Sequence, residues 1–293
     1  MKKVARWAGY GLGGLLGLVL LAAAGIWGMS AYALGRTVEA RPERVDLAHA
    51  NLAEGRRMLA INGCQGCHGP DLRGTKFFDQ PGVGTLNAPN LTLLAASVTD
   101  QQLAQAIRQG IGHDGRPLMA MPSSTYAALT DAELSNLIAA IRAEPRGGTA
   151  MPAIALGPLG HLGVALGKFR SEPELLADPH AETPVDLGPA TAPGRHLALT
   201  ACAHCHGANL TGNEIEPGVA PPDLAVVGSY DRAQFAHLMK TGLPPGGRHL
   251  KLMTEAGEKG FSHLTDAEVS ALFDYLQARA RQEQARGSAV RGS

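Results

Sequence analysis

The chain opens with one long apolar stretch and then alternates between short amphipathic segments and loops rich in glycine and proline. From Trp7 to Gly35 no residue is charged, and leucine, alanine and glycine fill the middle of the stretch. A helix of this length spans about 30 Å of hydrocarbon. Lys2, Lys3 and Arg6 precede it, so the positive-inside rule leaves the N-terminus in the cytoplasm and exports the rest. We predict a membrane anchor over residues 1–36 and periplasmic domains after it.

A cleaved signal peptide is the alternative interpretation of this stretch. Ala31-Tyr32-Ala33 has the small-x-small form of a cleavage site. However, the apolar run exceeds the roughly 7 to 15 residues that are usual in such peptides. The length therefore favours an uncleaved anchor.

Two amphipathic helices recur in the same order in the two halves of the chain. The earlier helix of each half has a polar cap, a glutamine three residues later and a terminal glycine: Thr99, Gln102 and Gly110 in one half, and Asp231, Gln234 and Gly242 in the other. The later helix is "LTDAELSNLIAAI" or "LTDAEVSALFDYL", capped by Thr130 with Glu133 or by Thr265 with Glu268. Apolar residues follow each cap at i, i+3, i+4 and i+7, which predicts one buried face.

The repeat predicts two small helical domains, at residues 45–143 and 194–286. A shorter helical run also precedes each of two cysteine motifs, "NLAEGRRMLAING" and "GRHLALTA". We see no strand signal worth counting, so the predicted class is all-α. Residues 144–193, rich in proline and glycine, are predicted to be a linker whose apolar island "IALGPLGHLGVALGKF" packs across the two domains. Residues 287–293 are predicted to be a disordered tail.

Charge excludes one class of partner. The 293 residues carry 26 lysines and arginines against 26 aspartates and glutamates, which gives no net charge. A nucleic-acid binder needs a basic surface against the phosphates, so no nucleic-acid partner is expected.

All four cysteines fall in two versions of one motif. "CQGCHGPDLRG" begins at Cys64 and "CAHCHGANLTG" begins at Cys202. C-x-x-C-H is the attachment signature of c-type haem: two thiols on one helical turn add to the vinyl groups, and the next residue offers its imidazole to the iron. We therefore predict two covalently bound haems c, one on Cys64, Cys67 and His68, the other on Cys202, Cys205 and His206.

Three other uses of the cysteines remain open at this point. A thioredoxin-type dithiol needs a strand-to-helix context that the pattern does not predict. One zinc site with four thiolate ligands leaves the histidine after each pair unexplained. Simple disulfides are possible in an exported protein but leave the histidines unexplained as well.

The repeat also selects the second axial ligand. After the earlier helix, the halves continue as "GRPLMAM" and "GRHLKLM", so Met121 corresponds to Met253, whereas Met119 corresponds to Lys251. A methionine sulfur is a common sixth ligand in electron carriers. We predict iron coordination by His68 with Met121 and by His206 with Met253, and keep Met119 as the alternative to Met121. Met58 and Met239 are interpreted as core residues, and Met151 lies in the linker.

Further matched residues are candidates for contacts around each haem. Pro89 in "APNLT" corresponds to Pro222 in "PPDLA", and either carbonyl can accept the other ring N–H of the axial histidine. Arg116 and Arg248 are candidates to pair with haem propionates. Tyr126 and Phe261 are predicted to wall the haem. The remaining histidines do not recur at matched positions, which favours surface or core roles.

These motifs resemble those of membrane-anchored, multi-haem c-type cytochromes. The motifs "NGCQGCHGPDLRG", "APNLT", "GRPLMAMP" and "LTDAEL", with their counterparts, resemble the cytochrome subunits of periplasmic alcohol and gluconate dehydrogenases and related dihaem cytochromes c, over nearly all of residues 50–280. The resemblance implies two class I-like cytochrome c domains that pass electrons toward quinone or a terminal oxidase. Those dehydrogenase subunits carry three haem motifs, whereas this chain has two and an N-terminal anchor.

The expected function is electron transfer rather than catalysis. A dihaem cytochrome c tethered to the bacterial inner membrane would relay single electrons between redox proteins of the periplasm or membrane: a dehydrogenase, a soluble cytochrome or a terminal oxidase. The alternative is a dihaem enzyme, a peroxidase or a sulfur-compound oxidoreductase. That enzyme needs one iron with an open sixth position, and the matched methionines argue against it.

Overall fold

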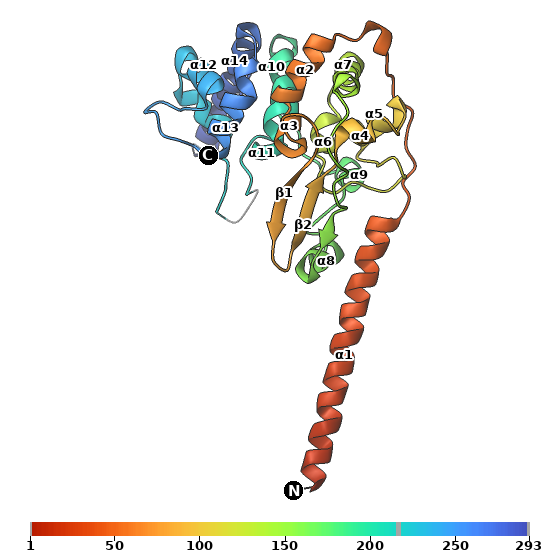
Figure 1. Cartoon of the computed structure of the whole chain (residues 1–293). Helices are drawn as coiled ribbons and strands as arrows, with labels where there is room; N and C mark the ends of the chain where they lie inside the picture. Colours follow the sequence, from red (N-terminus) through yellow and green to blue (C-terminus); the bar gives the residue numbers. More distant parts are fainter. Residues whose placement is uncertain (1, 215–217, 292–293) are drawn as a thin grey trace.

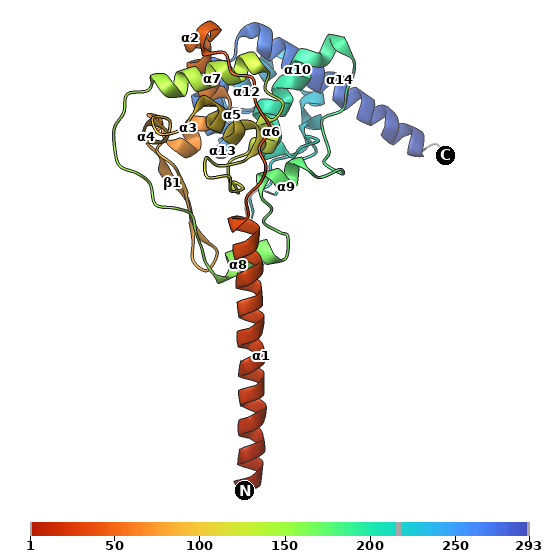
Figure 2. The same ribbon diagram turned by 90° about the vertical axis from the view of Figure 1, so that its right-hand side faces the viewer.

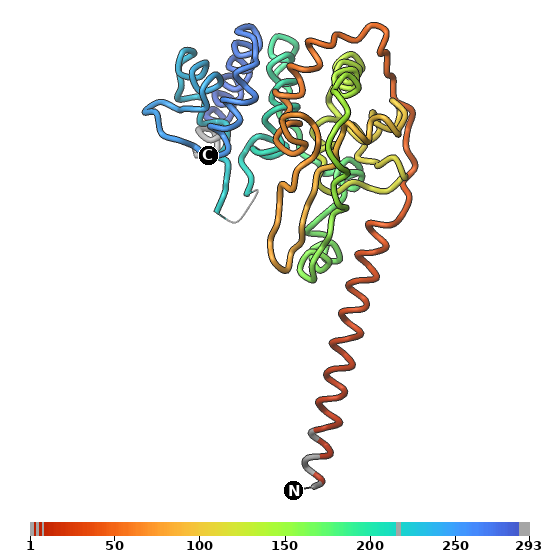
Figure 3. The backbone as a smooth tube through the Cα atoms, in the orientation of Figure 1, coloured from red at the N-terminus to blue at the C-terminus, as the bar shows by residue number. Residues whose placement is uncertain are grey.

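One long helix projects from a mostly helical head. The computed structural model describes residues 2–214 and 218–291. Helix α1, Lys2–Gly35, extends away from the head, which contains everything that follows (Figures 1 and 3). Its stretch Gly9–Gly35 has a mean hydropathy of 2.0 and is long and apolar enough to cross a membrane.

The first domain follows α1. Its elements are η1 (Leu47–His49), α2 (Leu52–Ile61), α3 (Cys64–His68), β1 (Thr75–Gln80), β2 (Gly84–Ala88), α4 (Leu91–Leu94), α5 (Asp100–Gln109), α6 (Ser123–Tyr126) and α7 (Asp131–Ala143). The capping boxes predicted for α5 and α7 are both formed, at Thr99 with Gln102 and at Thr130 with Glu133. Gly110 ends α5 with a φ of 65°, a left-handed conformation that glycine adopts without strain.

The second domain repeats this arrangement. Its elements are η2 (Pro189–Thr191), α10 (Ala192–Leu197), the π-helical segment η3 (Ala198–Cys202), α11 (Ala203–His206), η4 (Leu224–Ser229), α12 (Arg232–Thr241), α13 (Leu252–Lys259), η5 (Phe261–His263) and α14 (Asp266–Arg291). Asp231 with Gln234 caps α12, and Gly242 ends it with a φ of 68°. The predicted helices of both halves are thus confirmed.

One close helix crossing fixes each domain. In the first domain α2 packs on α7, and a Cβ at Gly55 would overlap the carbonyl oxygen of Asn136. In the second domain α10 packs on α14, and a Cβ at Gly194 would overlap the carbonyl oxygen of Ala271. The same crossing, with a glycine at the same place, shows that the two domains share one skeleton.

A small sheet differs from the sequence prediction. β1 and β2 form an antiparallel hairpin, with Thr75 opposite Ala88 and Gln80 opposite Gly84, and β3 (Ala155–Leu156) pairs with β2. The register is irregular between Lys76 and Phe78. A bulge interrupts the two-residue alternation of side chains. For that reason the apolar pattern of the hairpin carried no strand signal.

The segment between the domains is more ordered than a linker. Besides β3 it contains α8 (Pro158–Ala165) and α9 (Glu172–Leu176). The expectation that its apolar island packs across the two domains is wrong, because α8 packs on α1 and α9 packs on α5 and α6 of the first domain. The pattern showed that the island is apolar but not which apolar surface it meets.

The C-terminal end also differs from the expectation. α14 extends to Arg291, past Arg286 where the predicted domain ends. Residues 292–293 of the predicted tail lie outside the described residues.

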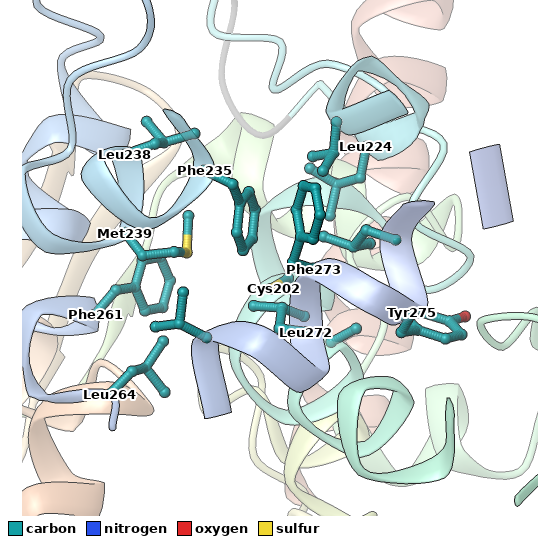
Figure 4. Packing of buried hydrophobic residues seen from close by; sticks show 14 of the residues in the cluster. Cys202, Leu224, Phe235, Leu238, Met239, Phe261, Leu264, Leu272, Phe273 and Tyr275 are labelled. Atoms are coloured by element: carbon teal, nitrogen blue, oxygen red, sulfur yellow. The ribbon is translucent and has the colours of Figure 1, made fainter. Parts of the chain in front are cut away.

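Each domain has its own hydrophobic core. The first core includes Met58, Leu103, Tyr126 and Leu137, and the second includes Cys202, Phe235, Phe261 and Phe273 (Figure 4). Ile61, at the end of α2 in the first domain, is buried in the core of the second. The two domains are therefore packed together at the side where α2 ends.

Candidate functional site

Both cysteine motifs form a short helical turn. Cys64 begins α3, and Cys202 ends η3 directly before α11. All four cysteines are free thiols, so the disulfide alternative is not formed. His68 and His206 end the two turns, and both are buried.

Each motif histidine is oriented by a prolyl carbonyl. Nδ1 of His68 lies 2.9 Å from the carbonyl oxygen of Pro89, and Nδ1 of His206 lies 2.8 Å from that of Pro222. A carbonyl only accepts, so Nδ1 carries the proton and donates it, which leaves Nε2 with a free lone pair. Burial lowers the pKa of both histidines, although the carbonyl bonds partly oppose it. Each ring is therefore neutral and suited to bind a metal through Nε2.

The surroundings of the four cysteines raise the pKa of their thiols. Burial raises the pKa of Cys64 and of Cys202 to about 12, and it also raises the pKa of Cys67 and Cys205. Redox-active dithiols have lowered pKa values, because the thiolate is the attacking species. The environment thus argues against the thioredoxin-type alternative.

The loop after each histidine has one conformation in both domains. Gly69 and Gly207 have φ values of 83° and 82°. Leu72 and Leu210 follow with φ values of 55° and 67°, which are strained for a leucine, and both side chains are fully buried. Their carbonyls accept from the amides of Leu91 (2.8 Å) and Leu224 (2.9 Å), just after the two prolines. These leucines hold the proline loops in place beside the histidines. Both motifs contain Leu-x-Gly in "DLRG" and "NLTG", but the sequence alone does not show this role.

The predicted methionines lie on the cores that carry the cysteine motifs. Met121 lies in the loop before α6 and packs against the first core, as Cys64 also does. Met253, on α13, packs on the second core, to which Cys202 belongs. Both side chains, like that of Met119, are half-buried. Their bonds to iron remain a prediction.

The other predicted residues separate into two groups. Arg116 and Arg248 are exposed, and Arg116 forms a long ion pair with Asp114 (3.5 Å). Tyr126 and Phe261 are buried in the two cores, and the hydroxyl of Tyr126 donates to the carbonyl of Asn62 at 2.5 Å. The aromatic residues are therefore near the motifs, whereas the arginines are on the surface.

The domain interface brings the two motifs together. α6, which contains Tyr126, contacts η3, and α2 contacts η5, which contains Phe261. In each domain, the helical segment before the cysteine motif therefore contacts the short helix that carries the aromatic residue of the other domain. Burial raises the pKa of Tyr126 well above 10, and Cys64, Cys67 and Cys205 raise it further. Burial and nearby Cys67 both raise the pKa of Cys205. Cys67 and Cys205 therefore lie near the interface, on opposite sides of it.

Two equivalent ion pairs fasten this interface. Arg57 of α2 donates to Glu268 at 2.7 and 2.8 Å. His196 of α10 lies 2.8 Å from Glu133. Counted from Gly55 and Gly194, Arg57 and His196 occupy the same helix position, and both glutamates are the capping residues of the last helix. The pairs are not evident from the histidines of the sequence, because His196 matches no other histidine, but they become recognisable when His196 is aligned with Arg57.

The residues present fit covalently bound haem and not a bare metal ion. Within residues 2–214 and 218–291, no group of three or more histidine, cysteine, aspartate or glutamate residues is arranged to hold a metal. A zinc site of four thiolates is thus not formed. Two thiols and one neutral histidine with a free Nε2 on a single turn are the donor set of a c-type haem.

The comparisons with known proteins agree with this donor set. Residues 191–280 match the family described as "Cytochrome c", and residues 50–139 match "Cytochrome C oxidase, cbb3-type, subunit III". The chain is 26% identical over 282 residues to the fructose dehydrogenase cytochrome subunit of Gluconobacter japonicus. The aligned region covers 83% of this chain and 56% of that relative. The chain therefore spans little more than half the length of that relative. Two segments of the chain thus match cytochrome c domains, which supports electron transfer and implies covalently bound haem c, and the chain resembles the cytochrome subunits of dehydrogenases.

Proposed function

We propose that this chain binds two haems c and relays single electrons between redox proteins at the bacterial inner membrane. The observation that supports the relay is the packing of the two domains beside their motifs: α6 contacts η3, α2 contacts η5, and Ile61 of α2 is buried in the second core. Two redox centres attached to these turns would exchange electrons within one rigid head.

Each residue at the motif has a defined part in this function. The thiols of each motif form the thioether bonds, and Nε2 of His68 or His206 binds the iron. Pro89 and Pro222 keep the rings in one tautomer and orientation through the 2.9 and 2.8 Å bonds. Met121 and Met253 provide the sixth ligands and exclude substrate. Haem c supplies a one-electron couple when it is bound.

The membrane location belongs to the same proposal. The long apolar helix α1, with lysine and arginine before it, anchors the chain and leaves both domains in the periplasm. A tether raises the effective concentration near membrane partners. The similarity to a fructose dehydrogenase cytochrome subunit favours a dehydrogenase as the electron donor, and a quinone or a terminal oxidase is the acceptor.

A haem count combined with carbon monoxide binding tests the proposal. We expect two covalent haems per chain, neither of which binds the gas in the reduced protein. In Met121→Ala or Met253→Ala one of the two haems should bind the gas while both remain attached, and Met119→Ala should behave as the wild type. Gas binding by the wild type would instead favour the dihaem enzyme, and an unchanged Met121→Ala spectrum would refute the ligand assignment.

Purification from mild detergent tests the partner. A dehydrogenase that co-purifies in constant ratio supports an electron-transfer subunit. If the cytochrome elutes alone and the membrane fraction still reduces it, its electron donor is a separate protein that diffuses to it rather than a bound subunit.

A further inference from the structure

The segment of residues 154–169 is fixed against the upper end of the anchor. Nδ1 of His161 in α8 lies 2.9 Å from the hydroxyl of Ser30 in α1, and Ser30 is 0% exposed. The ring of His161 also lies 6.4 Å from that of Trp27. Figures 1 and 2 both show α8 at the foot of the head, beside the last turns of α1. The segment therefore lies beside the last turns of α1, closer to the membrane-spanning part of that helix than the rest of the head.

The length of the anchor sets that level relative to a bilayer. Gly9–Gly35 has 27 residues. At 1.5 Å per residue it extends about 40 Å, the thickness of a bilayer including both headgroup layers. Arg36, the first charge after the span, then lies at the outer water boundary, and Trp27 lies about 13 Å deeper. α8 contacts α1 between these two residues, a range of depth that covers the outer headgroup layer and the adjoining hydrocarbon.

The chemistry of the segment changes at the same level. Residues 149–167 contain no aspartate, glutamate, lysine or arginine. On the side of this segment that faces the head, charged residues are present again and form ion pairs. Arg36 pairs with Glu174 at 2.9 Å, and Arg170 pairs with Asp178 at 2.7 Å. A groove between α1 and the segment shows the same change, from Met29, Val164 and Phe169 to Arg170 and Glu174. The boundary between apolar and charged contacts thus coincides with the predicted membrane surface.

The segment exposes large apolar side chains. Leu159 is 57% exposed, Leu166 is 64% exposed and Phe169 is 42% exposed. The turn of the β1–β2 hairpin lies beside them and supports them, because the amides of Gly157 and Leu159 donate to the carbonyls of Val83 and Gly82, both at 2.8 Å. Lys168, between Leu166 and Phe169, is exposed and available to lipid phosphates. Apolar side chains flanked by a cation and aromatic rings are typical of a membrane interface.

We propose that residues 154–169 form a membrane-embedded foot, with Leu159, Leu166 and Phe169 inserted into the outer leaflet. The partner is the lipid bilayer itself, because the foot is continuous with the membrane-spanning helix that it contacts. The inference rests on the proposed anchor. Its consequence is that the head has one orientation on the membrane, since the foot and α1 hold it at two places.

Photocrosslinking of the full-length haem protein in lipid nanodiscs tests the foot. The photoreactive residue p-benzoyl-phenylalanine replaces Leu166 or Leu159 in the test samples. It replaces Leu20, in the middle of α1, in the positive control, and Leu252, an exposed leucine of the second domain, in the matched negative control. Lipid adducts are measured by mass spectrometry, and the haem content confirms folding.

The outcomes separate the foot from the anchor. We expect about as much lipid adduct at Leu166 and Leu159 as at Leu20, and at least about tenfold more than at Leu252. Lipid at Leu20 but not at Leu166 or Leu159 would overturn the foot and leave the anchor intact, and so would crosslinks from these two positions to a second copy of the chain. If Leu20 also lacks lipid, the anchor fails and the foot with it.

Discussion

In the first domain, Gly110 at the end of α5 abuts the side chain of Glu172, which comes from the segment between the domains. In the second domain, its counterpart Gly242 abuts the backbone of Thr254 in α13. Glu172 is fixed there by two bonds: its amide donates to the carbonyl of Leu118 at 2.8 Å, and its carboxylate accepts from the amide of Ser124 at 2.7 Å. The same place in one skeleton is thus filled by two different parts of the chain.

This difference shows how the domains depend on their surroundings. The second domain closes itself with α13, the helix that also carries Met253. The first domain has Met121 in a loop and uses α9 to cover the end of α5. Its supporting segment also contains α8, which contacts α1. The first domain is therefore coupled to α1 through this segment, whereas, among the described residues, the second domain bonds only to the end of the segment, at Glu182, Pro184 and Val185.

The interface itself is nearly symmetric. Arg57 with Glu268 and His196 with Glu133 are the same contact made in opposite directions, as in a two-fold interface between identical subunits. The asymmetry lies in the cation, since arginine stays charged and histidine titrates near neutral pH.

The glycines at the helix crossings give the largest expected effect. Gly55→Ala and Gly194→Ala each place a methyl group on a backbone carbonyl of the crossing helix. Overpacking of this kind costs about 3 kcal/mol of unfolding free energy. We expect similar losses in urea unfolding followed through the haem absorbance. Gly66→Ala, which meets no atom within 4 Å, should be neutral. A tolerated Gly55→Ala alongside a damaging Gly194→Ala would contradict the shared skeleton.

The two interface cations rank next. Arg57 donates to Glu54, Glu268 and the carbonyl of His263, so Arg57→Ala should cost about 2 kcal/mol. His196→Ala removes one pair and should cost about 1 kcal/mol. Urea unfolding measures both, and the exposed pair of Lys259 with Glu255 on α13 provides the control, since Lys259→Ala should have little effect on stability. Equal losses for Arg57→Ala and His196→Ala would show that the extra bonds of Arg57 do not contribute.

The sequence predicted what depends on short-range pattern. Helix ends followed from Thr99, Asp231, Thr130 and their glutamine or glutamate partners, because a cap is local chemistry. The motif histidines and their prolines followed from the repeat, and the predicted bonds to Pro89 and Pro222 are formed.

What the sequence did not predict depends on contacts between distant segments. The partner of α8 is an apolar face of α1, and the apolar pattern of either helix fits many surfaces. The hairpin is half-exposed and bulged at Lys76, so it lacks alternation. The packing of the two domains is fastened by the ion pairs of Arg57 and His196, which become recognisable only when the repeat is aligned through Gly55 and Gly194.

Tyr126 distinguishes the two cores at a smaller scale. Its hydroxyl donates to the carbonyl of Asn62 at the end of α2, whereas the corresponding Phe261 has no hydroxyl. Tyr126→Phe leaves a buried carbonyl without this partner and should cost about 1 kcal/mol of unfolding free energy. Urea unfolding measures the loss, and the haem content should be unchanged. A neutral Tyr126→Phe would show that the first core does not depend on this bond.

The smallest expected effect is a pH dependence confined to one of the two ion pairs. The bond to Glu133 raises the pKa of His196 above its usual 6.5, although burial opposes the shift. Burial raises the pKa of Glu133, but the bonds from His196 and Thr130 outweigh it and lower that pKa to about 2. A histidine with a raised pKa stabilises the folded state fully below its unfolded pKa, and this contribution is lost as the pH rises through the folded pKa. A carboxylate with a lowered pKa contributes above its unfolded value of 4.5 and loses the contribution as the pH falls towards 2.

The pair of His196 with Glu133 is therefore strongest between about pH 4.5 and pH 6.5, and it weakens as the pH rises above that window. Arg57 remains charged throughout, so its pair with Glu268 does not change there. Urea unfolding of the wild type and of His196→Gln, compared at pH 6 and pH 8.5, isolates the effect, because the haem ligands and all other groups are common to both proteins. We expect the wild type to be more stable by less than about 1 kcal/mol at pH 6, with a smaller difference at pH 8.5. A difference that grows with pH would mean that neutral His196, rather than its charge, fastens this half of the interface.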